Sequence, residues 1–132
     1  MSSPAWLNLR RALADTGVFI LWYRGEAKAK VFFRNPNIEI YYSRMTRKEL
    51  LRPPISDAER RRIQMMLATL RQINPDASVT KAYTDLLRLY PNLRHHLADA
   101  LIAASAWAKN LPLVTTNVRH FRSVKEIEVI PF

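Results

Sequence analysis

Residues 97–106 read Leu97-Ala98-Asp99-Ala100-Leu101-Ile102-Ala103-Ala104-Ser105-Ala106 and decide the fold. The segment predicts a helix that is apolar almost all round and runs on to about Lys109, which is typical of a helix inside a core. Its one carboxylate, Asp99, would be costly to bury alone, so it needs water, a polar partner or a cation. Residues 113–117, Leu113-Val114-Thr115-Thr116-Asn117, predict a short buried strand that ends in polar groups.

Strand-like segments alternate with helical patterns along the rest of the chain. Residues 12–14 predict a strand that delivers Asp15 at its end, residues 37–42 a second strand and residues 127–130 a last one. Alternating strands and helices favour a three-layer α/β/α fold with a mainly parallel sheet. Functional sites in such sheets lie at the carboxyl ends of the strands, where we expect Asp15 and Asn117.

Helical spacing of apolar residues predicts further helices. The clearest begins with a capping box, Ser56 with Glu59 three residues on, and its apolar positions recur as far as Ile73, where Asn74-Pro75 ends it. We expect this helix to pair with the one that follows it. The other helices are predicted over residues 18–23, 46–51 and 79–90. The second of these carries Glu49.

Composition sets the class of protein. The 132 residues are 48% hydrophobic and show no linker, repeat or shift in composition, so we expect one domain over residues 1–132. Cysteine is absent, which fits a reducing compartment, and the longest early apolar run, residues 18–23, is far too short to span a bilayer. We therefore expect a cytoplasmic protein without a membrane segment.

The chain is strongly basic. It has 21 Lys and Arg against 11 Asp and Glu, a formal charge of +10. A field of this sign concentrates polyanions and acidic partners, which favours nucleic acid or an acidic protein as a partner. The simpler alternative is that the charge only keeps the protein soluble.

Three carboxylates and one amide fall at comparable places in this predicted fold. Asp15, Glu49 and Asp99 come from far-apart segments, and Asn117 ends a strand. Oxygen donors without cysteine or a histidine pair match Mg²⁺ or Mn²⁺ rather than Zn²⁺. Taken singly, each residue also has an ordinary explanation as a helix cap, a solvated helical residue or a turn former.

Histidines and basic clusters have simpler interpretations. We interpret His95, His96 and His120 as surface or loop groups, because their spacing presents no pair of imidazoles on one helix face. Residues 60–62, three arginines, are interpreted as the solvated side of the capped helix, with RNA contact as the alternative.

Four segments, which together span nearly the whole chain, carry a resemblance to a known family. They are Ala14-Asp15-Thr16-Gly17-Val18, Thr46-Arg47-Lys48-Glu49-Leu50, residues 99–106 and residues 113–121. They resemble the PIN-domain ribonucleases and, within them, the small VapC-type toxins of prokaryotic toxin-antitoxin pairs. Gly17 sits where Asn or Ser is common in that family, and Asn117 where many relatives carry Asp.

The resemblance implies an endoribonuclease that uses Mg²⁺ or Mn²⁺, usually as a homodimer, and that is inhibited by a small antitoxin in its acidic cleft. By family position, Asp15, Glu49 and Asp99 look like the metal-binding acids. Asn117 carries one negative charge fewer than the Asp of its relatives, which suggests that it positions water. The implied products carry 5′-phosphate and 3′-hydroxyl ends.

Other residues are expected to support this site. The hydroxyls of Thr16, Thr115 and Thr116 are expected to hold its ligands by hydrogen bonds. Basic residues near the acids in sequence are the candidates for contact with RNA phosphates: Arg24, Arg47 and Lys48.

Two alternatives remain open from the sequence. The first is a noncatalytic or weakly catalytic PIN-like module that binds RNA or protein through its basic surface. The second is a nuclease with the same ions that acts on DNA. The sequence does not specify which RNA would be cut.

Overall fold

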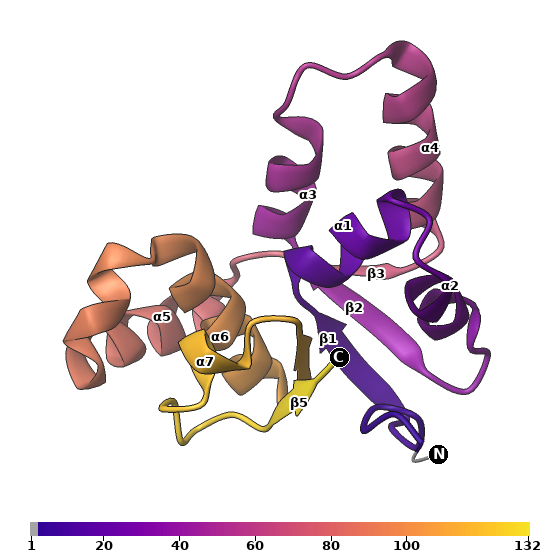
Figure 1. Ribbon diagram of the computed structural model, residues 1–132. Helices are drawn as coiled ribbons and strands as arrows, with labels where there is room; N and C mark the ends of the chain where they lie inside the picture. Colours follow the sequence, from indigo (N-terminus) through magenta and orange to yellow (C-terminus); the bar gives the residue numbers. More distant parts are fainter. Residues whose placement is uncertain (1–2) are drawn as a thin grey trace.

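A five-stranded parallel sheet forms the centre of the molecule, as seen in a computed structural model that describes residues 3–132 (Figure 1). The strand order is β3-β2-β1-β4-β5, and every neighbouring pair is parallel. The predicted α/β/α class is therefore confirmed. The strands are β1 (Arg11–Ala14), β2 (Glu39–Ser43), β3 (Arg71–Ile73), β4 (Leu113–Thr115) and β5 (Val129–Pro131).

Helices cover both faces of this sheet. No helix in residues 3–132 has the length and apolar character needed to cross a membrane. The helices are α1 (Thr16–Tyr23), α2 (Ala27–Arg34), α3 (Arg44–Leu51), α4 (Asp57–Ala68), α5 (Ala77–Leu89), α6 (Leu97–Lys109) and α7 (Val118–Phe121), with a 3₁₀ turn, η1 (Pro91–His95), before α6.

The strands send alternate side chains to two separate cores. Ala12 and Ala14 of β1 pack with α1, α2 and α4, whereas Leu13 packs with α5 and α6 on the other face. The same alternation separates Val114 from Leu113 in β4. Since β1 and β4 are buried on both faces, they are the rigid base on which the polar residues that follow them are positioned.

The prediction of one long helix up to Ile73 was wrong. The capping box of Ser56 is present, but α4 ends at Ala68, where the Thr69 hydroxyl donates to the Met66 carbonyl at 2.7 Å. Residues 71–73 instead form β3, and Ile73 is buried in the core on the opposite face from α4. The chain leaves the helix because an edge of β2 is open to pair with it.

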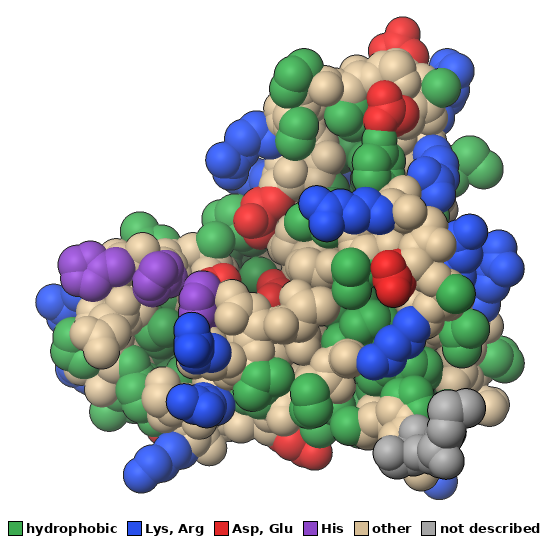
Figure 2. Space-filling view, in the orientation of Figure 1, with side chains coloured by type: hydrophobic (Ala, Val, Ile, Leu, Met, Phe, Trp, Pro, Cys, Tyr) green, Lys and Arg blue, Asp and Glu red, His purple; other side chains and the backbone are tan. Residues whose placement is uncertain are grey.

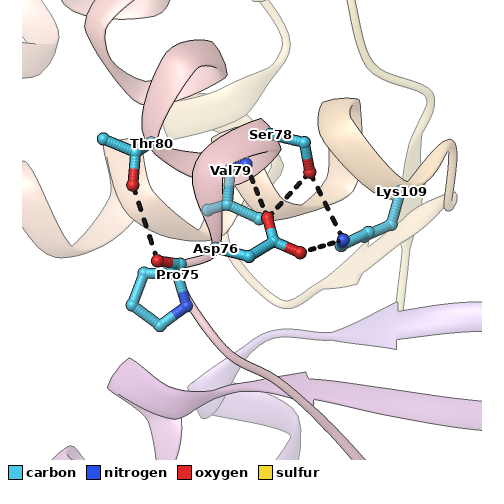
Figure 3. Close-up of polar contacts among 6 residues, drawn as sticks. All are labelled: Pro75, Asp76, Ser78, Val79, Thr80 and Lys109. Carbon is cyan, nitrogen blue, oxygen red and sulfur yellow. Dashed lines mark hydrogen bonds and ion pairs between the residues drawn. The ribbon is translucent and has the colours of Figure 1, made fainter.

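The expected pairing of α4 with the next helix was also wrong. α4 and α5 lie in different cores, and α5 packs on α6 instead (Figure 1). Figure 3 shows how the start of α5 is fastened to the end of α6. Asp76 caps α5 by accepting from the Val79 N–H at 3.0 Å, and it accepts from Lys109 Nζ at 2.5 Å. The hydrogen bond from Lys109, with those from Val79 and Ser78, holds the pKa of Asp76 well below its usual range.

Candidate active site

The carboxyl ends of β1 and β4 meet at one polar centre. Asp15 follows β1 and forms the N-cap of α1, and Thr115 ends β4. The Thr115 hydroxyl donates to Asp15 Oδ2 at 2.7 Å, a contact between residues 100 positions apart. The parallel pairing of β1 with β4 brings them together, as the sequence predicts for strand ends at one edge.

Asp15 is a buried acid in an environment that disfavours its charge. Its side chain is 7% exposed and accepts from the Thr16 N–H at 2.7 Å. Burial is the largest cause of a raised pKa for Asp15, and the negative charges of Asp99 and Glu49 raise it further, against the lowering effect of the two hydrogen bonds. Asp99 and Glu49 therefore each lie close enough to Asp15 to disfavour its charged form.

Glu49 is held by Thr16, which in turn contacts Thr46. The Thr16 hydroxyl donates to Glu49 Oε1 at 2.8 Å, and because its single proton is used there, it accepts from the Thr46 hydroxyl at 2.9 Å. Thr46 is fully buried and was missed in the sequence. The signal that identifies it is its position three residues before Glu49, on the same face of α3.

Asp99 lies at the start of α6 beside Asn117 and His120. His120 Nδ1 is 2.9 Å from Asp99 Oδ2 and 2.8 Å from Asn117 Nδ2. The Asn117 N–H donates to the Thr115 hydroxyl at 2.9 Å, so Thr115 connects this group to Asp15. His120 is exposed, as the sequence predicts, but it also contacts an acid of the site, which the sequence analysis missed.

The other predicted residues occupy varied positions. Thr116 is exposed and lies over Gly17, where an added Cβ would come within 2.3 Å of the Thr116 hydroxyl oxygen. Arg47 and Lys48 precede Glu49 on α3. Arg24 is the C-cap of α1, at the opposite end of that helix from Asp15.

The site is strongly anionic and its donors are oxygens. Among residues 3–132, no Lys or Arg forms an ion pair with Asp15, Glu49 or Asp99. Oxygen donors of this kind suit Mg²⁺ or Mn²⁺. Across the same residues, no three Asp, Glu, His or Cys side chains stand close enough together to surround a single ion.

The surface is hollowed beside Glu49. Figure 2 shows the surface indented between the side formed by α3 and α4 and the side formed by α5 and α6, with acidic side chains in the indentation and histidines along its α6 side. Next to Glu49 the surface opens into a mainly apolar pocket of about 290 Å³. Its lining includes Ile20, Tyr23, Leu50 and Ile63.

Comparison with known proteins agrees with this architecture. No curated protein matches the sequence. Among solved structures, VapBC2 from Rickettsia felis, bound to a DNA fragment from its promoter, is similar over 92% of this chain and 98% of that chain, with a TM-score of 0.75 and 19% identity. A toxin-antitoxin complex from Klebsiella pneumoniae matches with a TM-score of 0.74 and 26% identity over 88% and 94% of the two chains. VapBC-1 from nontypeable Haemophilus influenzae matches with a TM-score of 0.73 and 20% identity over 92% and 97%.

The family model described as the PIN domain matches residues 12–127. This range begins in β1 and continues past α7, so it includes all four residues expected to form the site. By sequence and by fold, the chain belongs to the PIN domain family.

Proposed function

We propose that this protein is a metal-dependent endoribonuclease and the toxin of a type II toxin-antitoxin pair. The observation that carries the proposal is that the buried Asp15, at the carboxyl edge of a parallel sheet, has the charges of Asp99 and Glu49 as neighbours and no Lys or Arg partner among the described residues. Acids gathered in this way are costly to the free protein, and they are explained if they bind a divalent cation.

Asp15, Glu49 and Asp99 would hold Mg²⁺ or Mn²⁺, which supplies a water of lowered pKa and neutralises charge on the phosphodiester. Thr115 fixes the Asp15 carboxylate, and Thr16 fixes Glu49. In the proposed reaction a water molecule oriented by the Asn117 amide attacks phosphorus. The new bond joins the water oxygen to phosphorus, and the bond from phosphorus to the 3′ oxygen breaks, leaving 5′-phosphate and 3′-hydroxyl ends.

The basic surface supports RNA as the substrate. A charge of +10 attracts the phosphate backbone, and the acids occupy only one part of the surface. Arg47 and Lys48, which neighbour Glu49 on α3, would contact phosphates beside the scissile bond. Arg24, at the far end of α1, would contact RNA further away.

An antitoxin is the proposed regulatory partner. The relatives from Rickettsia felis, Klebsiella pneumoniae and Haemophilus influenzae are described as VapBC or toxin-antitoxin complexes. In this chain the pocket has an apolar lining and includes the acidic side chain of Glu49. Such a surface fits a partner segment that carries apolar side chains followed by a cation, which would block the acids. We propose a homodimer as the toxin's assembled form.

The test is cleavage of a fluorescent single-stranded RNA with and without Mn²⁺, comparing the native chain with Asp99→Asn. We expect the variant to lose Mn²⁺-dependent cleavage while keeping its circular dichroism spectrum. The matched control is Asp57→Asn, which changes an exposed acid in the first turn of α4 and should cleave normally.

Two outcomes contradict the proposal. If the native chain binds RNA without cleaving it in Mn²⁺ or Mg²⁺, the protein is a binding module. If a DNA oligomer of the same sequence is cut as fast as the RNA, the substrate assignment is wrong.

A further inference from the structure

A second hollow lies between α1, α2 and α4, outside the site of the acids. It is a groove of about 730 Å³, which we call the α4 groove, and its lining includes the aromatic rings of Trp22 and Phe33 and the exposed side chain of Met65. No Asp or Glu among the described residues lines it, and its charged lining residues are Arg34, Arg61 and Arg62. Figure 2 shows Lys and Arg side chains along the side of the molecule where α2 and α4 lie. The lining suits a ligand that is anionic and also presents flat or apolar surface.

The three consecutive arginines of α4 are not equivalent. Arg60 is half-buried, and its Nη2 lies 3.5 Å from the Leu51 carbonyl oxygen at the end of α3. Arg61 and Arg62 are exposed and line the α4 groove. The structure thus separates Arg60, which faces α3, from the pair that is available to a ligand.

Arg62 is held in the α4 groove by the end of α1. Its guanidinium carbon lies 4.7 Å from the centre of the Trp22 ring and 5.5 Å from that of the Tyr23 ring, within the range of a cation–π contact. Its Nη1 donates to the Tyr23 carbonyl at 3.4 Å. Among residues 3–132, no carboxylate forms an ion pair with Arg62 or with the other two arginines of the groove. The guanidinium is therefore oriented in advance, with N–H groups left over for an incoming anion.

The α4 groove continues from the pocket beside Glu49. Tyr23 lines that pocket, and Arg62 lies over the same tyrosine. Asp15 caps the start of α1 and Tyr23 ends it, and a helix of eight residues is about 12 Å long. An extended ligand that crosses the acids and follows α1 therefore reaches the α4 groove.

We propose that the α4 groove binds single-stranded RNA beside the segment that is cleaved. The inference rests on the proposed function, because it extends the path of the same substrate. Each nucleotide pairs one phosphate with one flat base, which matches a lining that mixes arginines with aromatic and apolar side chains. Arg61 and Arg62 would bind phosphates, and Trp22, Phe33 and Met65 supply surface for unpaired bases. A duplex fits less well, because its bases are stacked on one another and not accessible to these side chains.

The experiment measures RNA binding in EDTA, so that the proposed cleavage does not interfere. Fluorescence anisotropy follows a labelled single-stranded RNA of about 16 nucleotides and its duplex at several salt concentrations. The intact native chain is compared with the double variant Arg61→Gln, Arg62→Gln. The matched control, Arg88→Gln with Arg94→Gln, removes the same charge from exposed arginines of α5 and η1, on the other face of the sheet.

We expect the Arg61, Arg62 variant to bind the single strand about tenfold or more weakly than the native chain. The slope of log affinity against log salt should fall by about 1 to 2, since two phosphate contacts are lost. The control should bind within about twofold of the native chain, and the native chain should bind the duplex more weakly than the single strand. With Mn²⁺ present, the variant should cleave with a raised KM and an almost unchanged kcat, because it changes docking and not the acids.

The contradicting results separate this inference from the proposed function. If the variant and the control bind the single strand equally, or if the duplex binds as tightly as the single strand, the α4 groove is not the RNA site. Labelled polyglutamate of similar charge tests an acidic protein segment as the occupant. If it binds as tightly as RNA and loses as much in the variant, RNA is the wrong ligand. None of these results affects cleavage by the native chain in Mn²⁺, and absence of that cleavage would remove the function itself.

Discussion

Asp15 and Asp76 have the same local role and opposite environments. Asp15 is the N-cap of α1 and Asp76 that of α5, on opposite faces of the sheet, and each accepts a backbone N–H through its carboxylate. Asp76 is exposed and bound by Lys109, and its pKa is lowered. Asp15 is buried with Asp99 and Glu49 as charged neighbours, and its pKa is raised.

The difference separates a structural acid, Asp76, from the acid that we propose to be functional, Asp15. The ionised form of Asp76 is favoured in the folded chain, so this cap stabilises the fold. The ionised form of Asp15 is disfavoured by folding, so this cap is retained at a cost to stability, which is typical of a functional site. Helix capping alone, which is all that the local sequence indicates, cannot distinguish the two.

The largest expected difference between the two acids is in the rate of RNA cleavage after each is replaced by asparagine. Asp15→Asn should lower Mn²⁺-dependent cleavage by about 10²-fold or more, because a metal centre contributes several kcal/mol to the reaction. Asp76→Asn should cleave within about twofold of the native chain. Single-turnover cleavage of one RNA by both variants provides the measurement, and equal losses would contradict a functional distinction between the caps.

Next in size is the stabilisation by metal. An ion that binds only the folded chain stabilises it by about 2.7 kcal/mol at 100 times its dissociation constant. Mn²⁺ should therefore raise the Tm of the native chain and of Asp76→Asn, but not that of Asp15→Asn. Thermal unfolding in EDTA and in Mn²⁺ measures this, and an equal rise in all three chains would place the ion elsewhere.

The hydroxyl of Thr115 links Asp15 to Asn117, whereas the hydroxyl of Ser78 links Asp76 to a cation, Lys109. Thr115→Val keeps the shape but leaves the Asn117 N–H without this acceptor and Asp15 without this donor. We expect a loss of about 1–3 kcal/mol in the free energy of unfolding and a 10- to 100-fold loss of cleavage. Urea unfolding and cleavage rates measure the two effects; Ser78→Ala, beside Asp76, should leave cleavage unchanged.

The dependence of stability on pH should have opposite signs for the two caps. Because the pKa of Asp15 is raised above the ordinary 3.8, its contribution is most favourable below that pH and is lost as pH rises through the folded-state pKa. Asp15→Asn in EDTA should therefore gain on the native chain over that rise. Asp76, with a lowered pKa, contributes above 3.8 and loses its contribution as pH falls. Urea midpoints from acid to neutral pH test both, and parallel curves would refute the contrast.

The smallest effect concerns the residue two positions after each cap. Ser78 donates to Asp76 at 2.8 Å, whereas the equivalent position after Asp15 is Gly17. Gly17→Ser cannot reproduce that bond without moving Thr116, because its Cβ would lie 2.3 Å from the Thr116 hydroxyl oxygen. Rotation of Thr116 should limit the loss of cleavage to about tenfold or less; an increase in rate would show that the close approach is not needed.

Much of the fold could be predicted because apolar periodicity follows burial. The strand ending at Asp15, the strand over residues 113–115 and the helix carrying Asp99 all lie where the sequence places them. β3 could not be predicted, because it has three residues, two of them exposed, and pairs only because β2 leaves an edge open.

The site was predictable only in part, for a similar reason. Its acids stand out because charge is rare in apolar segments or at strand ends. His120 and Thr46 carry no such signal: an exposed histidine and a buried threonine acquire meaning only when α7 docks on α6 and α3 on α1. Residue chemistry identified the acids, and tertiary packing selected the residues that hold them.

The 100-position separation of Asp15 and Thr115 has a consequence during translation. All three acids leave the ribosome before β4, and until then β1, the central strand, has only β2 as a neighbour. A growing chain that lacks β4 therefore also lacks the hydrogen bond from Thr115 to Asp15. The activity proposed for this protein would therefore require β4 to have been synthesised, because Thr115 at its end holds Asp15.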